Sequence, residues 1–376
     1  MRRTFIDLVM GFAILGAASS LPAQPASHAP AWTPYEMAQG QFDKGAQLMR
    51  ERNWAGAAQA FERATTARTN FPQAYSNWGI SLVQLGKQSL SGPEQLHLFQ
   101  AAADKFSQAA AQEPDDKLTY ILWSETLLLI GDLPVESSAR LACYQGAVEK
   151  CRKAVALAPD DWESYSKWAV ILSTKLPEYA VNDEARFHLY TEAASLFAKA
   201  AARARFGSEV SPVYNNWGSA LVRAARVSPD RDVKQSLLRE SLSKFERAAK
   251  AHPGGAGTYT LWGDALLDLG RISRHRGDFR DAIEKLNTSL ALRPDDPATL
   301  YSLARVYAQL DEPVLAVQNL RKCFAVDHAQ VYRQSAPQDA DLAALRGTPE
   351  FDDLFGGKNV SQSVPNYNPP LSDTPR

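Results

Sequence analysis

The octet Tyr-Ser-Asn-Trp-Gly-Ile-Ser-Leu at residues 75–82 decides the fold of this chain, because versions of it begin again at Tyr120, Tyr165, Tyr214 and Tyr259. All five share the form Tyr-x2-Trp-small-x2-Leu, and successive tryptophans are 45, 45, 49 and 45 residues apart. Each octet places its large residues at i, i+3 and i+7, which is one face of an α-helix. A repeat with a period in this range is typical of a solenoid, in which each unit buries its apolar face against the next.

A second signature follows each octet and predicts a second helix in every repeat. Weaker copies of both signatures flank the five, around residues 42–64 and 303–323. Turn residues such as Gly92-Pro93 come soon after the first helix, so the second helix of pairs two to five should reach about 18–21 residues. We therefore predict an all-α fold, a solenoid of about seven antiparallel helix pairs over residues 35–326. The second signature reads Ala-x3-Phe-x2-Ala or a variant of it, at Ala102/Phe106/Ala109, Ala147/Cys151/Ala154, Ala193/Phe197/Ala200, Ser241/Phe245/Ala248 and Ala282/Leu286/Ser289.

Together the two signatures resemble the tetratricopeptide repeat, whose pattern runs Trp, Leu-Gly, Tyr and then Ala, Phe and Pro. The resemblance covers roughly residues 38–326 and implies a right-handed superhelix that binds proteins. Two features depart from the family pattern: a large aromatic residue stands where Leu is usual, and most repeats are longer. Residues 339–355 resemble the short element that closes many bacterial arrays, so residues 327–355 should cap the last apolar face.

The two ends of the chain predict segments outside the solenoid. Two arginines followed by an apolar run from Leu8 to Leu21 have the features of a secretory signal, with cleavage expected near Ala23. The run is shorter than the ~20 residues of a spanning helix. We expect a signal peptide at residues 1–23, a linker at 24–34, and an exported protein, periplasmic or secreted, without membrane insertion after cleavage. An uncleaved membrane anchor is the alternative. Residues 356–376 contain four prolines and should be disordered.

Reactive residues are spaced in ways that argue against an enzyme, a cofactor site or a metal site. The formal net charge of −1 and the absence of basic clusters argue against nucleic acid as a partner. Six histidines are scattered singly, and Cys143, Cys151 and Cys323 form no CxxC pair, so we expect three buried thiols. The octet tryptophans could stack on sugars or bases, but their helical register predicts core residues. Asp-Asp pairs at 115–116, 160–161 and 295–296 should cap helices.

The leading hypothesis is a non-catalytic scaffold that binds a peptide or protein surface along the concave face of the first helices. The first helix of the third pair is apolar on both sides. Its second apolar face is either buried against neighbouring pairs or an anchor site for a partner. The family's carboxylate-binding cluster is not supported, because its Lys and Asn residues lack the required order. Candidate partner-binding residues are Ile121, Leu122, Glu125, Leu128, Leu129, Lys167, Asn215, Asn216 and Arg223.

A second hypothesis belongs to a different class of function. The chain could be a structural subunit of an envelope complex that associates with itself through its long second helices. The sequence does not decide its oligomeric state. It also does not name the partner.

Overall fold

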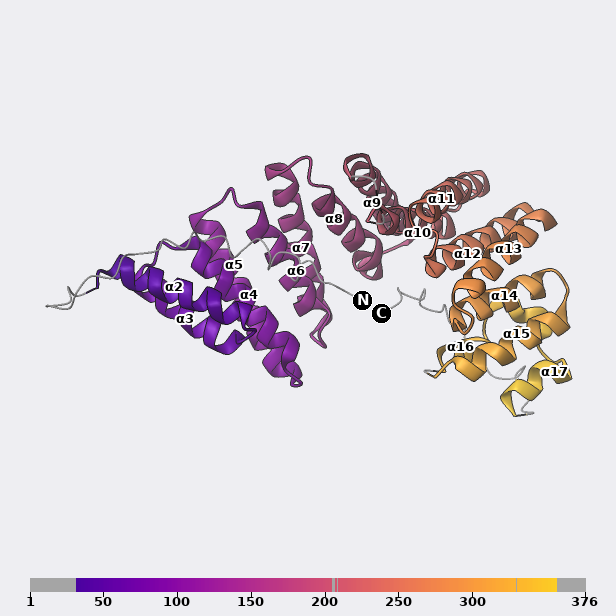
Figure 1. Cartoon of the computed structure of the whole chain (residues 1–376). Coiled ribbons are helices and arrows are strands. Elements are labelled where there is room, and N and C mark those ends of the chain that lie inside the picture. Colours follow the sequence, from indigo (N-terminus) through magenta and orange to yellow (C-terminus); the bar gives the residue numbers. More distant parts are fainter. Residues whose placement is uncertain (1–31, 205–206, 208, 329, 357–376) are drawn as a thin grey trace. The chain divides into compact units, whose positions relative to one another are not determined.

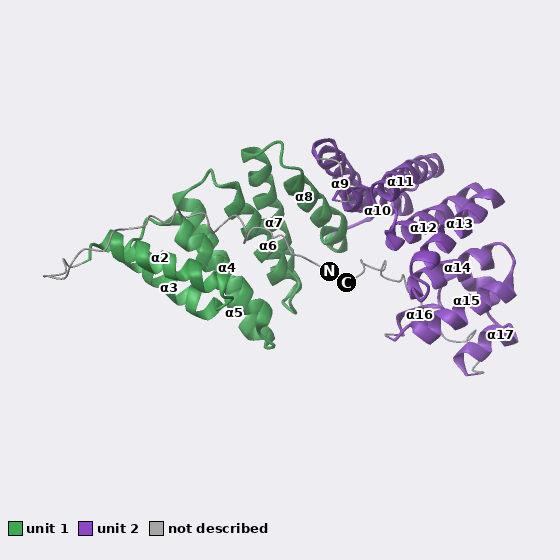
Figure 2. Cartoon of the chain, viewed as in Figure 1, with its two compact units in different colours: residues 1–179 green, residues 180–376 purple. Residues whose placement is uncertain are grey.

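A computed structural model of the chain describes residues 32–204, 207, 209–328 and 330–356, and its regular secondary structure is helical throughout (Figure 1). The described residues form two compact units, with the boundary after Tyr179 (Figure 2). The expected signal peptide, most of the linker and the tail from residue 357 onward lie outside the described residues. The linker expected at 24–34 ends slightly early, because Pro34 is already helical.

Unit 1 contains three consecutive helix pairs and the first helix of a fourth. Each helix packs on the next, and the first helices α2, α4 and α6 also contact one another in order. The elements are α2 (Pro34–Arg50), α3 (Trp54–Ala67), α4 (Pro72–Gln88), α5 (Gly92–Gln112), α6 (Lys117–Gly131), α7 (Ser137–Leu157), α8 (Trp162–Thr174) and the 3₁₀ helix η1 (Leu176–Tyr179).

Unit 2 begins with the second helix of that fourth pair and continues with three further pairs. The first helices α10, α12 and α14 contact one another in order. The elements are α9 (Asp183–Arg203), α10 (Val210–Val227), α11 (Arg231–Ala251), α12 (Ala256–Ser273), α13 (Arg276–Leu292), α14 (Pro297–Gln309), α15 (Pro313–Val326), α16 (Val331–Ser335), η2 (Ala340–Leu345), α17 (Pro349–Asp352) and η3 (Asp353–Phe355).

The predicted all-α solenoid is confirmed in its main elements. The five octets lie in α4, α6, α8, α10 and α12, and each second signature lies in the helix that follows. The four long second helices α5, α7, α9 and α11 have 21 residues each, at the upper end of the expected range. The predicted fourth pair is divided, because α8 belongs to unit 1 and α9 to unit 2.

Aspartates fix the starts of three first helices, as the sequence predicts. The side chains of Asp116, Asp161 and Asp296 accept hydrogen bonds from backbone N–H groups in the first turns of α6, α8 and α14. These N–H groups have no partner inside the helix, so each cap stabilises its helix start by about 1 kcal/mol.

In the second, third, fifth and sixth pairs, the signature residue of the second helix contacts the small residue of the octet. Phe106 on α5 has no exposed surface, and a methyl group on Gly79 would lie 2.8 Å from two of its ring carbons. Phe245 meets Gly218 in the same way. The third pair has Ser124 in place of glycine, and there the opposing residue is the smaller Cys151, 3.2 Å away between Oγ and Sγ. Close packing therefore explains why the octet has a small residue after its tryptophan.

The last short elements of unit 2 pack on α14 and α15. Leu342 and Phe351 have no exposed surface and share one core cluster with Leu320. The hydroxyl of Tyr301 on α14 donates to the Asp339 carboxylate at 2.8 Å. Both apolar and polar contacts therefore attach residues 331–355 to the last helix pair.

Candidate functional site

Four octet tryptophans belong to a repeated arrangement of one aromatic ring and one cation. The second helix of the same pair places a lysine Nζ over each ring, one residue before its buried signature residue. The distances from Nζ to the ring centre are 4.1 Å for Lys105 and Trp78, 4.2 Å for Lys150 and Trp123, 4.0 Å for Lys244 and Trp217, and 4.8 Å for Lys285 and Trp262. Contacts of this kind are worth about 0.5–1 kcal/mol at exposed sites.

The tryptophans are half-buried, which corrects the expectation that they are core residues. The octet tyrosine three residues earlier stacks on three of them, with ring centres 6.1–6.5 Å apart. Trp168 differs, because its cation is Arg152 from the preceding pair. Tyrosine and lysine cover these rings only in part, so some surface of each tryptophan stays accessible.

Between α5 and α7 the rings of Tyr120 and Trp123 on α6 form the aromatic floor of an open groove of 590 Å³. Small residues on α5 leave the space above the rings of Tyr120 and Trp123 empty. Residues of α7 form the opposite wall, which carries three cations and one carboxylate. The lining residues are Ser107, Ala110, Ala111, Tyr120, Trp123, Glu149, Lys150, Arg152 and Lys153.

The two lysines in this groove differ in whether a carboxylate neutralises them. Lys150 is paired with Glu149 at 2.9 Å and lies over Trp123. Lys153 is exposed and makes no ion pair within the described part of the chain, although its Nζ lies 5.9 Å from the centre of the Tyr120 ring. Burial, together with Asp115 and Asp116, raises the pKa of Tyr120, so its ring is neutral at physiological pH. The groove therefore combines an apolar aromatic floor with a basic wall.

The apolar face predicted on α6 is largely core. Ile121 and Leu122 have exposed fractions of 2% and 1%, so as partner-binding residues they are corrected: both are covered by neighbouring helices. Leu122 lies in the cluster that contains Phe106, and Ile121 in one that contains Ala154. This burial favours the core alternative over an anchor site. The predicted residues Leu128 and Leu129 are half-buried.

The polar candidates lie on the first helices, where they join one helix to the next. Glu125 on α6 accepts from Lys167 on α8 in a partly buried ion pair. In unit 2, Asn215 Nδ2 donates to Thr258 Oγ1 on α12 at 2.8 Å. Asn216 and Arg223 are half-exposed on α10. Glu125 and Lys167 are therefore brought together, whereas the three candidates on α10 belong to the other unit.

Carboxylates and arginines form a partly buried network on the first helices of unit 2. Arg226 on α10 reaches Asp268 on α12 at 2.7 Å, and Arg305 on α14 reaches Asp341 at 2.6 Å. Burial alone would raise the pKa of Asp268, but Arg226 and Arg305 outweigh it and lower that pKa. Burial raises the pKa of Asp264 in the same network. Sequence reasoning missed this network because pairs such as Arg226 with Asp268 and Arg305 with Asp341 join residues that are far apart in the sequence.

The cysteines correct one further expectation. Cys151 and Cys323 are buried, and burial raises the pKa of their thiols to about 11 and about 12. Cys143 is only half-buried, so two thiols rather than three lie in the core. Within the described residues, no group of His, Cys, Asp or Glu side chains has an arrangement suited to a metal ion. No helix in that part of the chain combines the length and apolarity needed to cross a bilayer.

Comparison with known proteins identifies the repeat. Residues 261–322 match the tetratricopeptide repeat family, the family that the two sequence signatures resemble. No curated protein matched the sequence.

Solved structures of tetratricopeptide-repeat proteins are similar in fold. One is the C-terminal part of a tetratricopeptide-repeat protein from Cytophaga hutchinsonii, with a TM-score of 0.51 and 13% identity over 76% of this chain and 95% of that one. A second is from Parabacteroides merdae, with a TM-score of 0.46 and 12% identity over 79% and 96%. YrrB, described as having an unusual peptide-binding site, has a TM-score of 0.41 and 18% identity over 62% and 98%.

Proposed function

We propose that this chain is a non-catalytic scaffold that binds a segment of another protein in the groove between α5 and α7. The observation that carries the proposal is the open floor of Tyr120 and Trp123 beside a basic wall. A bound segment would place an apolar or aromatic side chain on the two rings. An acidic side chain next to it would meet Lys153. Ring stacking and charge-assisted contacts are what such a surface offers a ligand.

The burial of the first-helix face supports placing the partner in this groove. On α6 that face uses Ile121 and Leu122 to pack against neighbouring helices, and Glu125 is already paired with Lys167. An approaching peptide would have to displace these contacts. The aromatic floor requires no such displacement, because Trp123 is only half-buried and the side of Tyr120 that faces the groove lines open space.

Peptide display on the full chain, followed by affinity measurements with the best-enriched peptide, tests the proposal. Enriched peptides should carry an acidic residue near an aromatic or aliphatic one. Lys153→Glu should weaken binding about tenfold or more, since contacts to a charged group are worth about 1.5–3 kcal/mol. Lys44→Glu is the matched control, because Lys44 is equally exposed but lies on α2.

A steric pair of variants locates the peptide independently of charge. Ser107→Tyr would fill the groove, whereas Gln108→Tyr places the same side chain one residue further along α5, outside the groove. Both residues are exposed, so neither change should unfold the protein. Binding that survives Ser107→Tyr as well as it survives Gln108→Tyr would exclude this groove as the site.

We also infer that the scaffold acts after export, in the periplasm or outside the cell. The inference rests on the charged start and short apolar run of residues 1–23. N-terminal sequencing of the native protein should give Gln24 or a neighbouring residue as the first residue. Recovery of intact Met1 from the cytosol would refute export, and intact Met1 in the membrane fraction would favour the uncleaved anchor.

A further inference from the structure

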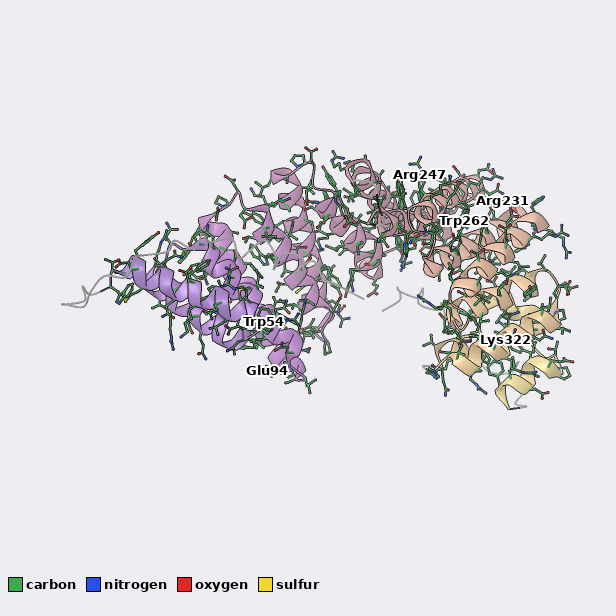
Figure 3. The ribbon with its side chains drawn as sticks, in the orientation of Figure 1. Trp54, Glu94, Arg231, Arg247, Trp262 and Lys322 are labelled. Carbon is green, nitrogen blue, oxygen red and sulfur yellow. The ribbon has the colours of Figure 1, made fainter. Side chains whose placement is uncertain are left out.

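Unit 2 contains a second recess, of 260 Å³, where the start of α11 meets the end of α12. Figure 3 labels Arg231 at the start of α11. Four of the six lining side chains are cations. The lining residues are Pro229, Arg231 and Lys234 on one side, and Arg271, Ile272 and Arg274 on the other.

Among the residues that the structure describes, carboxylates neutralise one of these four cations, Arg271. Arg271 forms ion pairs with Asp268 and Asp341, at 3.2 Å in each case. The guanidinium of Arg231 donates to the backbone carbonyl of Ile272 at 2.7 Å, a contact that positions the group and leaves its charge in place. The side chains of Lys234 and Arg274 make no ion pair or hydrogen bond within the described residues.

The other carboxylates near the recess are directed elsewhere or stay outside it. Asp230 caps α11 by accepting from the backbone N–H groups of Asp232 and Val233. Asp278 accepts from the hydroxyl of Ser273 at 2.6 Å. Asp232 is exposed and does not line the recess. The recess therefore holds an excess of positive charge that the carboxylates of the described residues do not compensate.

We propose that this recess binds a phosphate-type dianion, either a free phosphate or the phosphate monoester of a ligand. Guanidinium groups match the geometry of phosphate oxygens and can bind them through two parallel hydrogen bonds. A phosphate monoester carries about −1.5 to −2 charges at neutral pH, which suits several uncompensated cations better than the single charge of a carboxylate. The site belongs to unit 2 and does not depend on the peptide groove of unit 1.

Arg274 offers a way to separate binding from folding. It ends α12 with φ of 60°, in the left-handed region that helix ends usually fill with glycine. Arg274→Gly would therefore remove a cation of the recess and relax the backbone at the same time. If Arg274 had only a structural role, Arg274→Gly would leave anion binding unchanged.

Calorimetric titration of the full chain with inorganic phosphate tests the proposal. Saturable binding should weaken about tenfold or more in Arg274→Gly and in Lys234→Gln, because each removes a contact to a charged ligand. The melting temperature of Arg274→Gly should not fall. Arg239→Gln is the control, since Arg239 is an exposed residue of α11 outside the recess. Acetate should bind much more weakly than phosphate.

Four results would overturn the proposal: no saturable phosphate binding, unchanged binding in Arg274→Gly, an equal loss in Arg239→Gln, or acetate binding as tight as that of phosphate. Sedimentation with phosphatidylcholine vesicles, with or without phosphatidic acid, identifies the source of the phosphate. Binding only to the phosphatidic acid vesicles, lost in Arg274→Gly, assigns the site to a lipid headgroup. Phosphate binding without vesicle binding assigns it to a soluble ligand.

Discussion

Replacing Gly79 by alanine should destabilise unit 1, although alanine is the better helix former. The added methyl group would lie 2.8 Å from two ring carbons of Phe106. Because Phe106 is fully buried, its ring cannot move aside into solvent. Helix propensity favours alanine by about 1 kcal/mol. Overpacking of a filled core costs about 1–3 kcal/mol, so the net loss should be up to about 2 kcal/mol.

Gly40 provides the control with the same chemistry. It is exposed on α2, and a methyl group there would have no neighbour within 4 Å. Gly40→Ala should therefore stabilise the protein by about 0.5–1 kcal/mol. Urea unfolding of the full chain, followed by circular dichroism, measures both changes. An equal rise in the unfolding midpoint for Gly79→Ala and Gly40→Ala would refute the packing argument.

A double-mutant cycle extends the test. Phe106→Cys with Gly79→Ser recreates the combination that the third pair already has, with Ser124 opposite Cys151. Gly79→Ser should therefore cost less in the Phe106→Cys background than in the wild type, by about 0.5 kcal/mol or more. Additive costs would show that the two positions do not constrain each other.

Three further outcomes are expected. Leu122→Asp should lower the melting temperature far more than Leu128→Asp, because it places a charge at a core site where even Leu→Ala costs about 2–5 kcal/mol; equal effects would contradict the burial of Leu122. In the native protein Cys143 should react first with a thiol reagent, with the two buried cysteines following only on unfolding, and three equal rates would contradict this. Asp161→Ala should cost about 0.5–2 kcal/mol at neutral pH. Burial alone would raise the pKa of Asp161, but hydrogen bonds from Ser164 and Lys117 outweigh it and lower that pKa. The stability that Asp161 contributes is therefore present above its pKa in the unfolded chain. The difference between wild type and Asp161→Ala should disappear as pH falls through the lowered pKa of the folded state.

The sequence predicted the helices well because the information for them is local. Octet spacing identifies the first helices, and the aspartates that precede them identify their starts. The length between octet and signature gave the 21-residue second helices. Each of these features depends on residues within one repeat, where periodicity and capping are decisive.

The groove proposed as the binding site was harder to predict because it depends on the spacing between repeats. The helical register places Trp123 on the same face as Tyr120, but it does not reveal that the small residues of α5 leave an open groove beside the two rings. An apolar helix such as α6 is compatible with either a core or an exposed patch, and only the neighbouring helices decide. The small exposed residues Ser107 and Ala111, one turn apart on α5, were the available signal for the groove.

One repeated contact differs between neighbouring pairs: it joins Gly79 to Phe106 in the second pair and Ser124 to Cys151 in the third. This difference affects how a chain of similar repeats avoids incorrect assembly. Near-identical repeats can exchange partners while they fold, and such misassembly is a known failure of repeat arrays. A serine at this position leaves less room than a glycine for a phenylalanine opposite it, so α5 in place of α7 as the partner of α6 at this contact is disfavoured. Unequal volumes at this repeated contact thus distinguish the third pair from the second and the fifth.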